Sequence, residues 1–535
     1  MLQLAEQHEA MIHQSALFLH EAPLLHKSLY GLGGRQRQLV EGLSKMLAAY
    51  NGHWGVAADG DVRERRVKRH LVGHLNGAVL CPTLVALGMP SFSSESGAQI
   101  APSVLQTIHS RGGKAALTEL SERFPSPILE PLLNIAEAAE VLKIEGGMVV
   151  LGASGRELVQ ESANFGVVVS YIQLLIAAAE TLFASGQLKL AQGVDSFVDR
   201  AMNVWGSGRS TVLRSVRDRI GPAVLSPLFN SLPLELQPAG IADMGAGSGG
   251  PLSEMATYVL RRTLRGEQAS LAPLILIGAD PSPISRLQMT STLEPLRAVP
   301  GVECFILDAD VGDPADYAAA IENLPIKHPI RGDSLRAHDF LHSQMFLLHD
   351  RELRPRSLPE EWARLSAGWS PMRDRVASDI DLAVAGGKEW MLQSVLAAFD
   401  APYVVDGASV ESKVIAADLI ALLAKWRPML LDYGLILVEP HLPNVTVAQE
   451  PYPEDDATVM QIEIDAGPVI WAAHALSNQF LVSAQAQRSA LVLSGFAPYA
   501  EHLTASEGIS LGWWTCAEAV YTDVSAFELA DAEYI

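Results

Sequence analysis

A glycine-rich loop directly after an apolar segment is the first feature of this sequence that points to chemistry. The segment reads "GIADMGAGSGG" at 240–250, and Asp243 stands just before the loop. Three of the loop residues are candidates to lie against a ligand: Gly245, Gly247 and Gly249. Because glycine lets a ligand approach the backbone between a strand and a helix, the pattern predicts that the loop binds a nucleotide-type cofactor.

The acid before the loop separates two classes of cofactor. The spacing of Gly245, Gly247 and Gly250 also fits the dinucleotide fingerprint, which places a pyrophosphate over the loop. In such a site Asp243 would face two negative phosphates. S-adenosylmethionine carries no phosphate, and both its ammonium and its sulfonium are cationic. Asp243 therefore favours S-adenosylmethionine, with an NAD-binding or phosphate-binding relative as the alternative.

Two further acids follow the next two apolar segments. Asp280 ends "LILIGAD", 30 residues after Gly250, whereas the dinucleotide fingerprint expects an acid after about 20. A carboxylate at that position can accept hydrogen bonds from both ribose hydroxyls. Asp310, in "LDADV", ends the third segment and is expected to meet the adenine amino group. Three acids at successive strand ends, together with the loop, predict an S-adenosylmethionine site.

Histidines follow the later apolar segments. His349 and Asp350 come after "LHSQMFLL", His441 follows Glu439 after "LILVE", and "HALSNQ" contains His474 and Gln479. In one interpretation His349 or His441 is a general base that takes a proton from the methyl acceptor, with Asp350 beside it. In another, several of these side chains bind one divalent metal ion, iron or manganese. In a third they are core histidines with satisfied hydrogen bonds.

The segments that position these residues alternate between strands and helices from residue 236 onward. Each predicted strand is a nearly continuous apolar run, as expected for a parallel sheet covered on both faces. The predicted strands are 240–244, 273–280, 302–311, 341–348, 433–441 and 469–476. Ligands bind outside the carboxyl ends of such strands, so residues far apart in sequence can meet there. The expected fold class is α/β, with a Rossmann-like sheet.

The part of the chain before the sheet is predicted to be mostly helical. Helices around Gly112-Gly113, a further helix and a hairpin about Gly146-Gly147 are typical of a winged-helix-like module, which serves for dimerisation or as a lid in many methyltransferases. We therefore expect a homodimer. The predicted regions are a helical region at 1–100, the module at 101–158, a helical lid or linker at 159–235 and the cofactor-binding domain at 236–535.

Composition narrows the class of protein further. Apolar residues make up 49% and charged residues 19% of the chain, which is typical of a folded, core-rich protein. The net charge of −22 argues against a nucleic-acid partner, and the predicted module helix at 126–143 is acidic and apolar, which disfavours a DNA-binding regulator. The basic run "DVRERRVKRH" at 61–70 is either a solvated helix face or a docking patch for an anionic partner.

Cysteines and apolar runs bear on the compartment. Cys81, Cys304 and Cys516 have no paired spacing, which predicts a cytoplasmic protein without disulfides. No signal peptide is recognised at the N-terminus. The longest apolar run, 165–183, contains several polar residues, so we expect a buried or interfacial helix and no membrane span.

The motif series "IADMGAGSGG", "LILIGAD" and "LDADV" resembles that of class I S-adenosylmethionine-dependent methyltransferases, over roughly residues 236–525. The resemblance implies a seven-stranded sheet whose last strand is antiparallel, and 502–522 can supply that strand. Methyl transfer to an acceptor is the activity that it implies. A domain that binds S-adenosylmethionine without transferring its methyl group is the alternative.

A narrower resemblance comes from "VDSFVDRAMNVWGSG", "LLHDRELR", "EPH" and "HALSNQ". Together they resemble the metal-dependent C-methyltransferases in starter modules of apratoxin- and saxitoxin-type polyketide assembly lines. This resemblance implies methylation of the central carbon of a malonyl group on an acyl carrier protein. It also implies a mononuclear metal bound by His441, His474 and Gln479, with His349 a further candidate. A metal that chelates both carbonyl oxygens would stabilise the enolate. The alternative is a metal-free O- or N-methyltransferase that acts on a small molecule with a histidine base.

Overall fold

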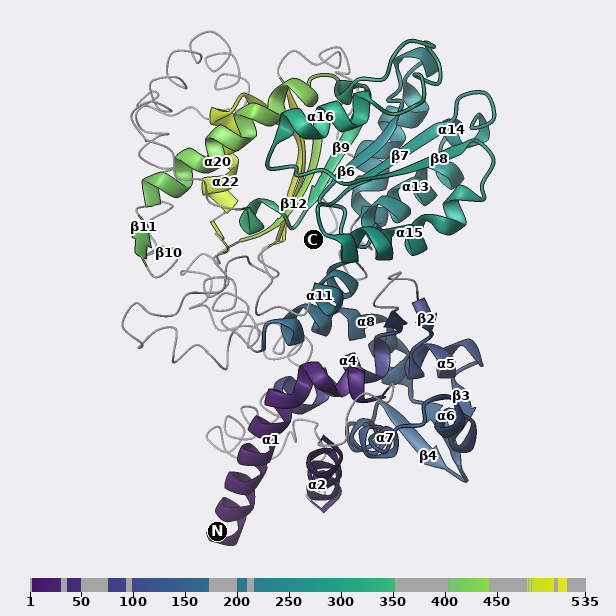
Figure 1. Cartoon of the computed structure of the whole chain (residues 1–535), viewed down its shortest axis with the longest axis vertical. Coiled ribbons are helices and arrows are strands. Elements are labelled where there is room, and N and C mark those ends of the chain that lie inside the picture. Colours follow the sequence, from purple (N-terminus) through teal and green to yellow (C-terminus); the bar gives the residue numbers. More distant parts are fainter. Residues whose placement is uncertain are drawn as a thin grey trace, which may run out of the picture. The chain divides into compact units, whose positions relative to one another are not determined.

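The structure is a computed structural model of the whole chain (Figure 1). The structure describes residues 2–29, 36–49, 76–92, 99–172, 200–208, 216–351, 403–405, 408–410, 412–441, 479, 481–482, 484–504 and 509–516. These residues fall into two compact units, one that ends with Gly208 and one that begins with Val216.

The first unit begins with helices that share one apolar core. The elements are α1 (Leu2–Leu29), α2 (Gln36–Ala49), the π-helical turn η1 (Asn76–Leu80) and α4 (Cys81–Gly88), followed by the short antiparallel pair β1 (Ser91–Phe92) and β2 (Gln99–Ala101). Phe18 and Leu25 of α1 and Leu43 of α2 are fully buried in this core. The helical character expected for this region is therefore present.

The expected winged-helix-like module follows. Its elements are α5 (Val104–Ser110), β3 (Lys114–Ala116), α6 (Leu117–Arg123), α7 (Leu129–Ala138), β4 (Leu142–Glu145) and β5 (Met148–Leu151), with strand order β3-β5-β4. Gly146 and Gly147 both have a positive φ, at 57° and 76°, which is the conformation that a two-residue turn between twisted strands requires. The short strand β3 was not predicted, because three residues carry too little pattern to reveal a strand.

Two further helices complete the first unit. Gly166 of α8 (Ala153–Ser170) and Gly206 of α11 (Arg200–Ser207) allow these helices to pack closely. A Cβ at Gly206 would lie 2.8 Å from the carbonyl oxygen of Ala163. Residues 153–170 form a helix, as predicted for the start of the longest apolar run, and 173–183 lie outside the described residues. No helix within the described ranges is long and apolar enough to cross a membrane.

The second unit contains a seven-stranded sheet with the order β13-β14-β12-β9-β6-β7-β8. Its strands are β6 (Gly240–Met244), β7 (Leu274–Ala279), β8 (Val302–Leu307), β9 (Phe340–Met345), β12 (Leu435–Pro440), β13 (Phe496–Thr504) and β14 (Ile509–Cys516). The strands from β12 through β9, β6 and β7 to β8 pair in parallel, and β14 pairs antiparallel with both β12 and β13. The predicted sheet and its antiparallel last strand are confirmed. The strand predicted at 469–476 lies outside the described residues, and β13 occupies the edge of the sheet.

Helices cover both faces of this sheet. One core lies under α16 (Pro314–Glu322), α20 (Ser412–Trp426) and α22 (Ala484–Leu493), and Ala242 and Ile277 contribute to it. Side chains alternate along a strand, so Asp243 and Gly278 point to the other face. There a Cβ at Gly278 would collide with Met289 of α15 (Pro283–Arg297), which packs beside α13 (Gly250–Arg262). The two faces thus have different helices and, near the carboxyl edge, different polar residues.

The boundary of the second unit differs from the prediction, which assigned residues up to 235 to a linker. The unit that contains the sheet also includes the π-helices η3 (Val216–Leu225) and η4 (Pro227–Ser231) and the 3₁₀ turn η5 (Leu234–Leu236). η3 packs on α13, where the ring of Tyr258 fills the space left by Gly221. The Tyr258 hydroxyl also lies 3.0 Å from Ser226 Oγ. These contacts join the segment to the sheet domain, and no local sequence pattern announces them.

The remaining elements of this unit are short. They are α14 (Leu264–Glu267), the antiparallel pair β10 (Tyr403–Val405) and β11 (Ala408–Val410), and the 3₁₀ turns η6 (Ala337–Asp339), η7 (Leu348–Asp350) and η8 (Arg427–Met429). The turn η6 leads into β9, and η7 follows its exit.

A buried arginine fixes the amino ends of β6 and β7. Arg265 of α14 is fully buried, and its guanidinium donates to the carbonyl oxygens of four residues in the segments that enter these strands. The acceptors and distances are Ala272 at 2.9 Å, Pro273 at 3.0 Å, Pro238 at 3.2 Å and Ala239 at 3.3 Å. Burial lowers the pKa of Arg265 to about 10, so the side chain stays charged at neutral pH.

We expect Arg265→Met to lower the free energy of unfolding by about 3 kcal/mol, because four buried carbonyl groups lose their donor. Urea unfolding followed by circular dichroism measures the change. Arg262→Met, at an exposed position of α13, is the matched control and should change stability by less than about 0.5 kcal/mol. Equal effects of the two variants would contradict the role assigned to Arg265.

Candidate active site

The glycine loop leaves β6 in a conformation that favours glycine. Gly245, Gly247 and Gly249 have φ angles of 69°, 53° and 74°, and Gly249 is the N-cap of α13. A Cβ would lie 2.7 Å from a Leu347 methyl carbon at Gly245 and 2.7 Å from Met289 Cγ at Gly249. Neither glycine could be replaced by a larger residue without a rearrangement of Leu347 or Met289. The loop therefore presents bare backbone at the carboxyl edge of the sheet, as a cofactor cradle requires.

Asp280 ties this loop to the end of β7. Its side chain is buried, Oδ2 accepts the Gly247 N–H at 3.0 Å, and Oδ1 accepts the Ser282 N–H at 2.8 Å. Arg286 donates both to the Asp280 carbonyl oxygen, at 2.9 Å, and to Asp308 Oδ1, at 2.8 Å. Each carboxylate oxygen has a second lone pair, so Asp280 can hold the loop and still accept a ribose hydroxyl.

Asp243 lies beneath the loop on the α15 face. It is almost fully buried, and the Ser343 hydroxyl of β9 donates to its Oδ1 at 2.7 Å. The pKa of Asp243 is raised to about 7, mainly by burial and to a smaller extent by the charge of Asp280, while the hydrogen bond from Ser343 opposes the shift. A cation that binds beside this carboxylate compensates for the charge that burial disfavours, so the site fits an ammonium or a sulfonium.

Asp310 is the most exposed of the three strand-end acids. Its Oδ1 accepts the Gly312 N–H at 2.8 Å in the turn after β8, while Asp308 is engaged by Arg286. The contact with adenine that the sequence predicts for Asp310 stays a prediction. The structure brings Asp243, Asp280 and the loop together, and their binding of S-adenosylmethionine stays a prediction.

A histidine and a glutamate meet where β9 and β12 end. His349 Nδ1 lies 2.7 Å from Glu439 Oε2, and both side chains are buried. Glu439 Oε1 accepts the backbone N–H groups of Leu347 and Leu348, each at 2.7 Å. Phe346, with φ of 59°, turns the chain so that these two amides and the imidazole follow the end of β9. Non-glycine residues in this left-handed backbone conformation are often found at functional sites.

Glu439 was missed as a functional residue, although the sequence analysis placed it at a strand end. The signal that could have found it is a carboxylate directly after a buried apolar run, next to a histidine in the same motif. The carboxylate accepts, so Nδ1 of His349 carries the proton and Nε2 is the ring nitrogen that can take up another. This arrangement is compatible with the general base that the sequence predicts for His349, a role that stays a prediction.

The two residues after His349 are held by other segments. Gln479 Nε2 donates to Asp350 Oδ1 at 2.8 Å, and Arg351 Nε donates to Asp418 of α20 at 3.0 Å. Asp350 therefore lies next to His349 in the chain but bonds to Gln479, which the sequence analysis assigned to a metal. The structure places this pair next to His349, and a role of Asp350 in a proton transfer stays a prediction.

His441 has a polar neighbour at each ring nitrogen. Nδ1 lies 3.1 Å from the Val482 carbonyl oxygen, and Nε2 lies 2.6 Å from Ser510 Oγ of β14. Burial lowers the pKa of His441, so the ring is neutral, with the proton on Nδ1. A metal ion at Nε2 would have to displace the Ser510 hydroxyl. His474, the third predicted ligand, lies outside the described residues, so the predicted ligand set is not tested.

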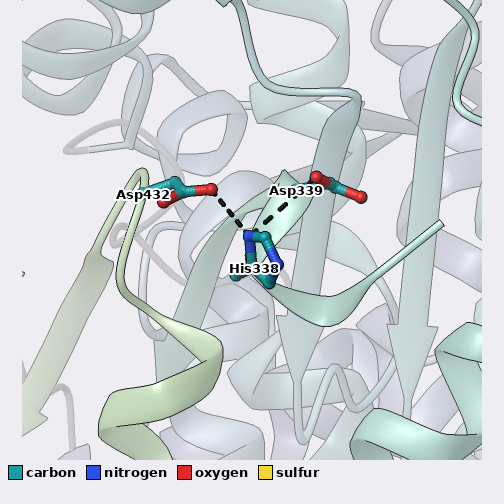
Figure 2. Close-up of side chains that lie close together, drawn as sticks. All are labelled: His338, Asp339 and Asp432. Atoms are coloured by element: carbon teal, nitrogen blue, oxygen red, sulfur yellow. Dashed lines mark hydrogen bonds and ion pairs between the residues drawn. The ribbon is translucent and has the colours of Figure 1, made fainter. Parts of the chain in front are cut away.

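Another cluster of a histidine and acids lies at the amino ends of β9 and β12 (Figure 2). Among the described residues, His338, Asp339 and Asp432 offer ligand atoms within 4.8 Å of one another, just before β9 and β12. His338 Nδ1 lies 2.7 Å from Asp432 Oδ2 and 4.0 Å from Asp339 Oδ1. The bond to Asp432 raises the pKa of His338.

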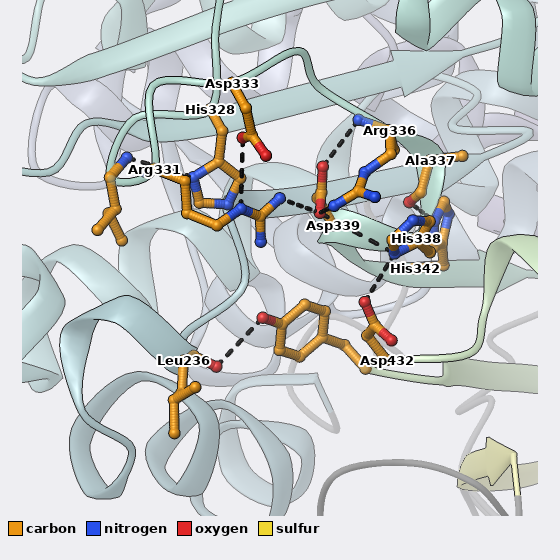
Figure 3. A network of polar contacts seen from close by, with 12 residues as sticks. Leu236, His328, Arg331, Asp333, Arg336, Ala337, His338, Asp339, His342 and Asp432 are labelled. Atoms are coloured by element: carbon orange, nitrogen blue, oxygen red, sulfur yellow. Dashed lines mark hydrogen bonds and ion pairs between the residues drawn. The ribbon is translucent and has the colours of Figure 1, made fainter.

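Arginines already balance the charge of this cluster (Figure 3). The guanidinium of Arg331 forms an ion pair with the buried Asp339, and the Arg336 backbone N–H donates to Asp339 Oδ2 at 2.8 Å. Arg336 Nη2 lies 3.8 Å from the same carboxylate. A cation would have to compete with two guanidinium groups. The network therefore fits a structural role at the amino ends of the strands, remote from the glycine loop.

Comparison with known proteins supplies the family. The model of a methyltransferase family described as "AprA MT2-like domain" matches residues 195–506, which is more than half of the chain. The chain belongs to the AprA MT2-like methyltransferase family. It is an S-adenosylmethionine-dependent methyltransferase, and the resemblance recognised in its motifs is confirmed. No curated protein matches the sequence.

Solved structures show distant likeness to this methyltransferase. They include the mitomycin 7-O-methyltransferase MmcR (11% identity, TM-score 0.43), the calicheamicin biosynthesis methyltransferase CalO1 (12%, 0.41) and human N-acetylserotonin methyltransferase (11%, 0.42). Each match covers 86% of this chain and 99% or 100% of the other. These identities and scores are too low to transfer a substrate or a mechanism.

The raised pKa of Asp243 predicts a pH-dependent affinity for S-adenosylmethionine. A cationic ligand favours the ionised carboxylate, so affinity should rise by up to about tenfold per pH unit below pH 7 and level off near that value. By the same linkage, Asp243 makes the ligand-free protein less stable as the pH rises from 3.8 to about 7. Calorimetric titration across this range measures the affinity.

Asp243→Asn is the matched variant for this titration. The substitution keeps the size of the side chain but removes the group that ionises. The affinity of this variant for S-adenosylmethionine should therefore be lower at neutral pH and should not change with pH below 7. A wild-type affinity that stays constant below pH 7, or an Asn variant that keeps the slope, would contradict the assignment.

Proposed function

We propose that this methyltransferase acts on an acceptor that loses a proton to His349, while Glu439 orients the base. The observation that carries this proposal is the 2.7 Å contact between His349 Nδ1 and Glu439 Oε2. Two backbone amides fix the other carboxylate oxygen, so Glu439 cannot turn away from the imidazole. A buried base with a fixed tautomer, close to the cofactor loop, fits proton removal followed by methyl transfer.

In this mechanism the acceptor proton moves to Nε2 of His349. The imidazolium that forms is stabilised by the Glu439 carboxylate, which also accepts the backbone N–H groups of Leu347 and Leu348. S-adenosylmethionine supplies an electrophilic methyl group: its methyl–sulfur bond breaks as the acceptor forms a bond to the methyl carbon, and sulfur keeps the electron pair. The glycine loop, Asp243 and Asp280 hold the donor, so orientation and electrostatics supply the rate.

The acceptor we propose is a malonyl-type carbon acid, presented as a thioester on an acyl carrier protein. The apratoxin-type resemblance and membership of the AprA MT2-like family support this choice. A carbon between two carbonyl groups is acidic enough for an imidazole to deprotonate, which fits the base seen here. A small-molecule oxygen or nitrogen acceptor, using the same base, is the alternative that the assay should include.

A metal-assisted version is a second candidate because of the environment of His441. Metal-binding histidines commonly donate their other ring N–H to a backbone carbonyl, as Nδ1 of His441 does to Val482. Iron or manganese held by His441, His474 and Gln479 would polarise the acceptor carbonyl groups. The Ser510 hydroxyl at Nε2 argues for the metal-free version, since it already satisfies the nitrogen that would bind the ion.

The base is tested by His349→Asn and Glu439→Gln. We expect kcat on a malonyl thioester to fall by about 10²–10⁴-fold in His349→Asn and by a smaller factor in Glu439→Gln, because the latter keeps the imidazole but weakens its orientation. Methyl incorporation measured by mass spectrometry gives the rates. His109→Asn, at an exposed helix position of the other unit, is the control and should match the wild type. Normal turnover by His349→Asn would refute the base.

Metal dependence separates the two versions. In the metal-free version the purified enzyme contains no stoichiometric metal by elemental analysis and keeps its turnover after prolonged chelation. In the metal-assisted version, chelation abolishes turnover, iron or manganese restores it, and His474→Ala loses both metal and activity. We expect the first result, from the hydrogen bonds of His441.

A further inference from the structure

Gln344 is a buried amide that finds no hydrogen-bond partner in the described part of the chain. Its side chain is 0% exposed, and neither Oε1 nor Nε2 has a partner there. The other polar residues of β9 are all engaged. His342 bonds to Tyr317 and to the Ala337 carbonyl, and Ser343 bonds to Asp243. Gln344 is thus an exception within its own strand.

A glutamine at this position lowers the stability of the fold, because its neighbours in the sheet are apolar. Gln344 pairs in register with Met244 of β6 and Leu437 of β12, both fully buried and apolar. Burying an amide without partners destabilises a protein, because the amide gives up its hydrogen bonds to water and gains none in return. Methionine or leucine would fill this position more stably. A fully buried amide without a partner in the described part of the chain points to a group that binds there during the reaction.

The sheet register places Gln344 on the side of the base. It lies opposite Leu437, and side chains alternate along β12, so Glu439 points to the same face, two residues farther along. Asp243 and Ser343 point to the other face. Gln344 therefore belongs with Glu439 and His349, and not with the groups that hold the cofactor.

We infer that the Gln344 amide binds the methyl acceptor, donating from Nε2 to the carbonyl oxygen beside the carbon that is deprotonated. The inference rests on the proposed function and specifies the substrate class: a carbon acid with a carbonyl next to the reacting carbon. As the proton moves to His349, the electron pair of the broken C–H bond shifts to that oxygen, and the amide stabilises the enolate. The oxygen of Gln344 then accepts from an N–H or O–H donor of the bound substrate.

The amide is free to make this contact. Glutamine has three side-chain torsions, and no hydrogen bond to the described residues opposes their rotation. A single donor to a developing oxyanion is worth about 10²–10³-fold in kcat. Gln344 would thus complement the base: His349 takes the proton and Gln344 receives the charge that the proton leaves behind.

Gln344→Met is the first test, with a malonyl thioester of a carrier protein as the probe. We expect an unchanged or higher melting temperature, unchanged affinity for S-adenosylmethionine and a kcat lower by about 100-fold. Gln344→Glu, which keeps the shape but replaces the donor by an oxygen, should lose turnover to a similar extent. A lower melting temperature for Gln344→Met, or turnover like that of the wild type, overturns the inference.

The buried Gln237 provides a matched control. Its amide donates to the Leu232 carbonyl at 2.9 Å, near the amino end of β6, so it has a structural partner. Gln237→Met should lower the melting temperature and leave kcat and KM unchanged, the opposite of Gln344→Met.

The outcomes also separate this inference from the proposed function. Normal turnover by Gln344→Met with loss of turnover by His349→Asn removes the role of Gln344 alone. A wild-type enzyme that transfers no methyl group to the malonyl thioester refutes the proposed acceptor, and the role of Gln344 falls with it.

Discussion

The carboxylate of Glu439 is the constraint on which the reactive side of this methyltransferase depends. It is buried at the end of β12, where an ion without partners would be strongly destabilised. Three donors from the chain after β9 compensate for its burial: the amides of Leu347 and Leu348 and the imidazole of His349. The left-handed Phe346 makes this arrangement geometrically attainable. One buried carboxylate thereby fixes a turn and the orientation of the His349 imidazole.

The two faces of the sheet divide the work at its carboxyl edge. The α15 face carries Asp243 and Ser343 beneath the glycine loop, and these residues suit the cationic donor. The face under α20 and α22 carries Glu439 and Gln344, which suit proton removal and the charge that it creates. Alternation along parallel strands produces this division without any additional element. Donor and acceptor can then approach one another over the strand ends.

Polar groups at the amino ends of the parallel strands hold the sheet together. Arg265 holds the entries of β6 and β7, and Arg331 and His338 hold the acids that precede β9 and β12. These groups form hydrogen bonds or ion pairs within the protein, whereas the amide of Gln344 finds no partner in the described part of the chain.

The sequence by itself determined the sheet, the glycine loop and the acids at the ends of the first strands, because each polar residue is adjacent in the chain to the apolar run that positions it. It also indicated His349 as a base. Only the tertiary structure decided that His349 bonds to Glu439, 90 residues away, and that Ser510 and Val482 satisfy His441. It likewise showed that Gln344 lies on the same face of the sheet as Glu439. Such pairings depend on strand register and on turns between distant segments, and no local pattern of residue types encodes them.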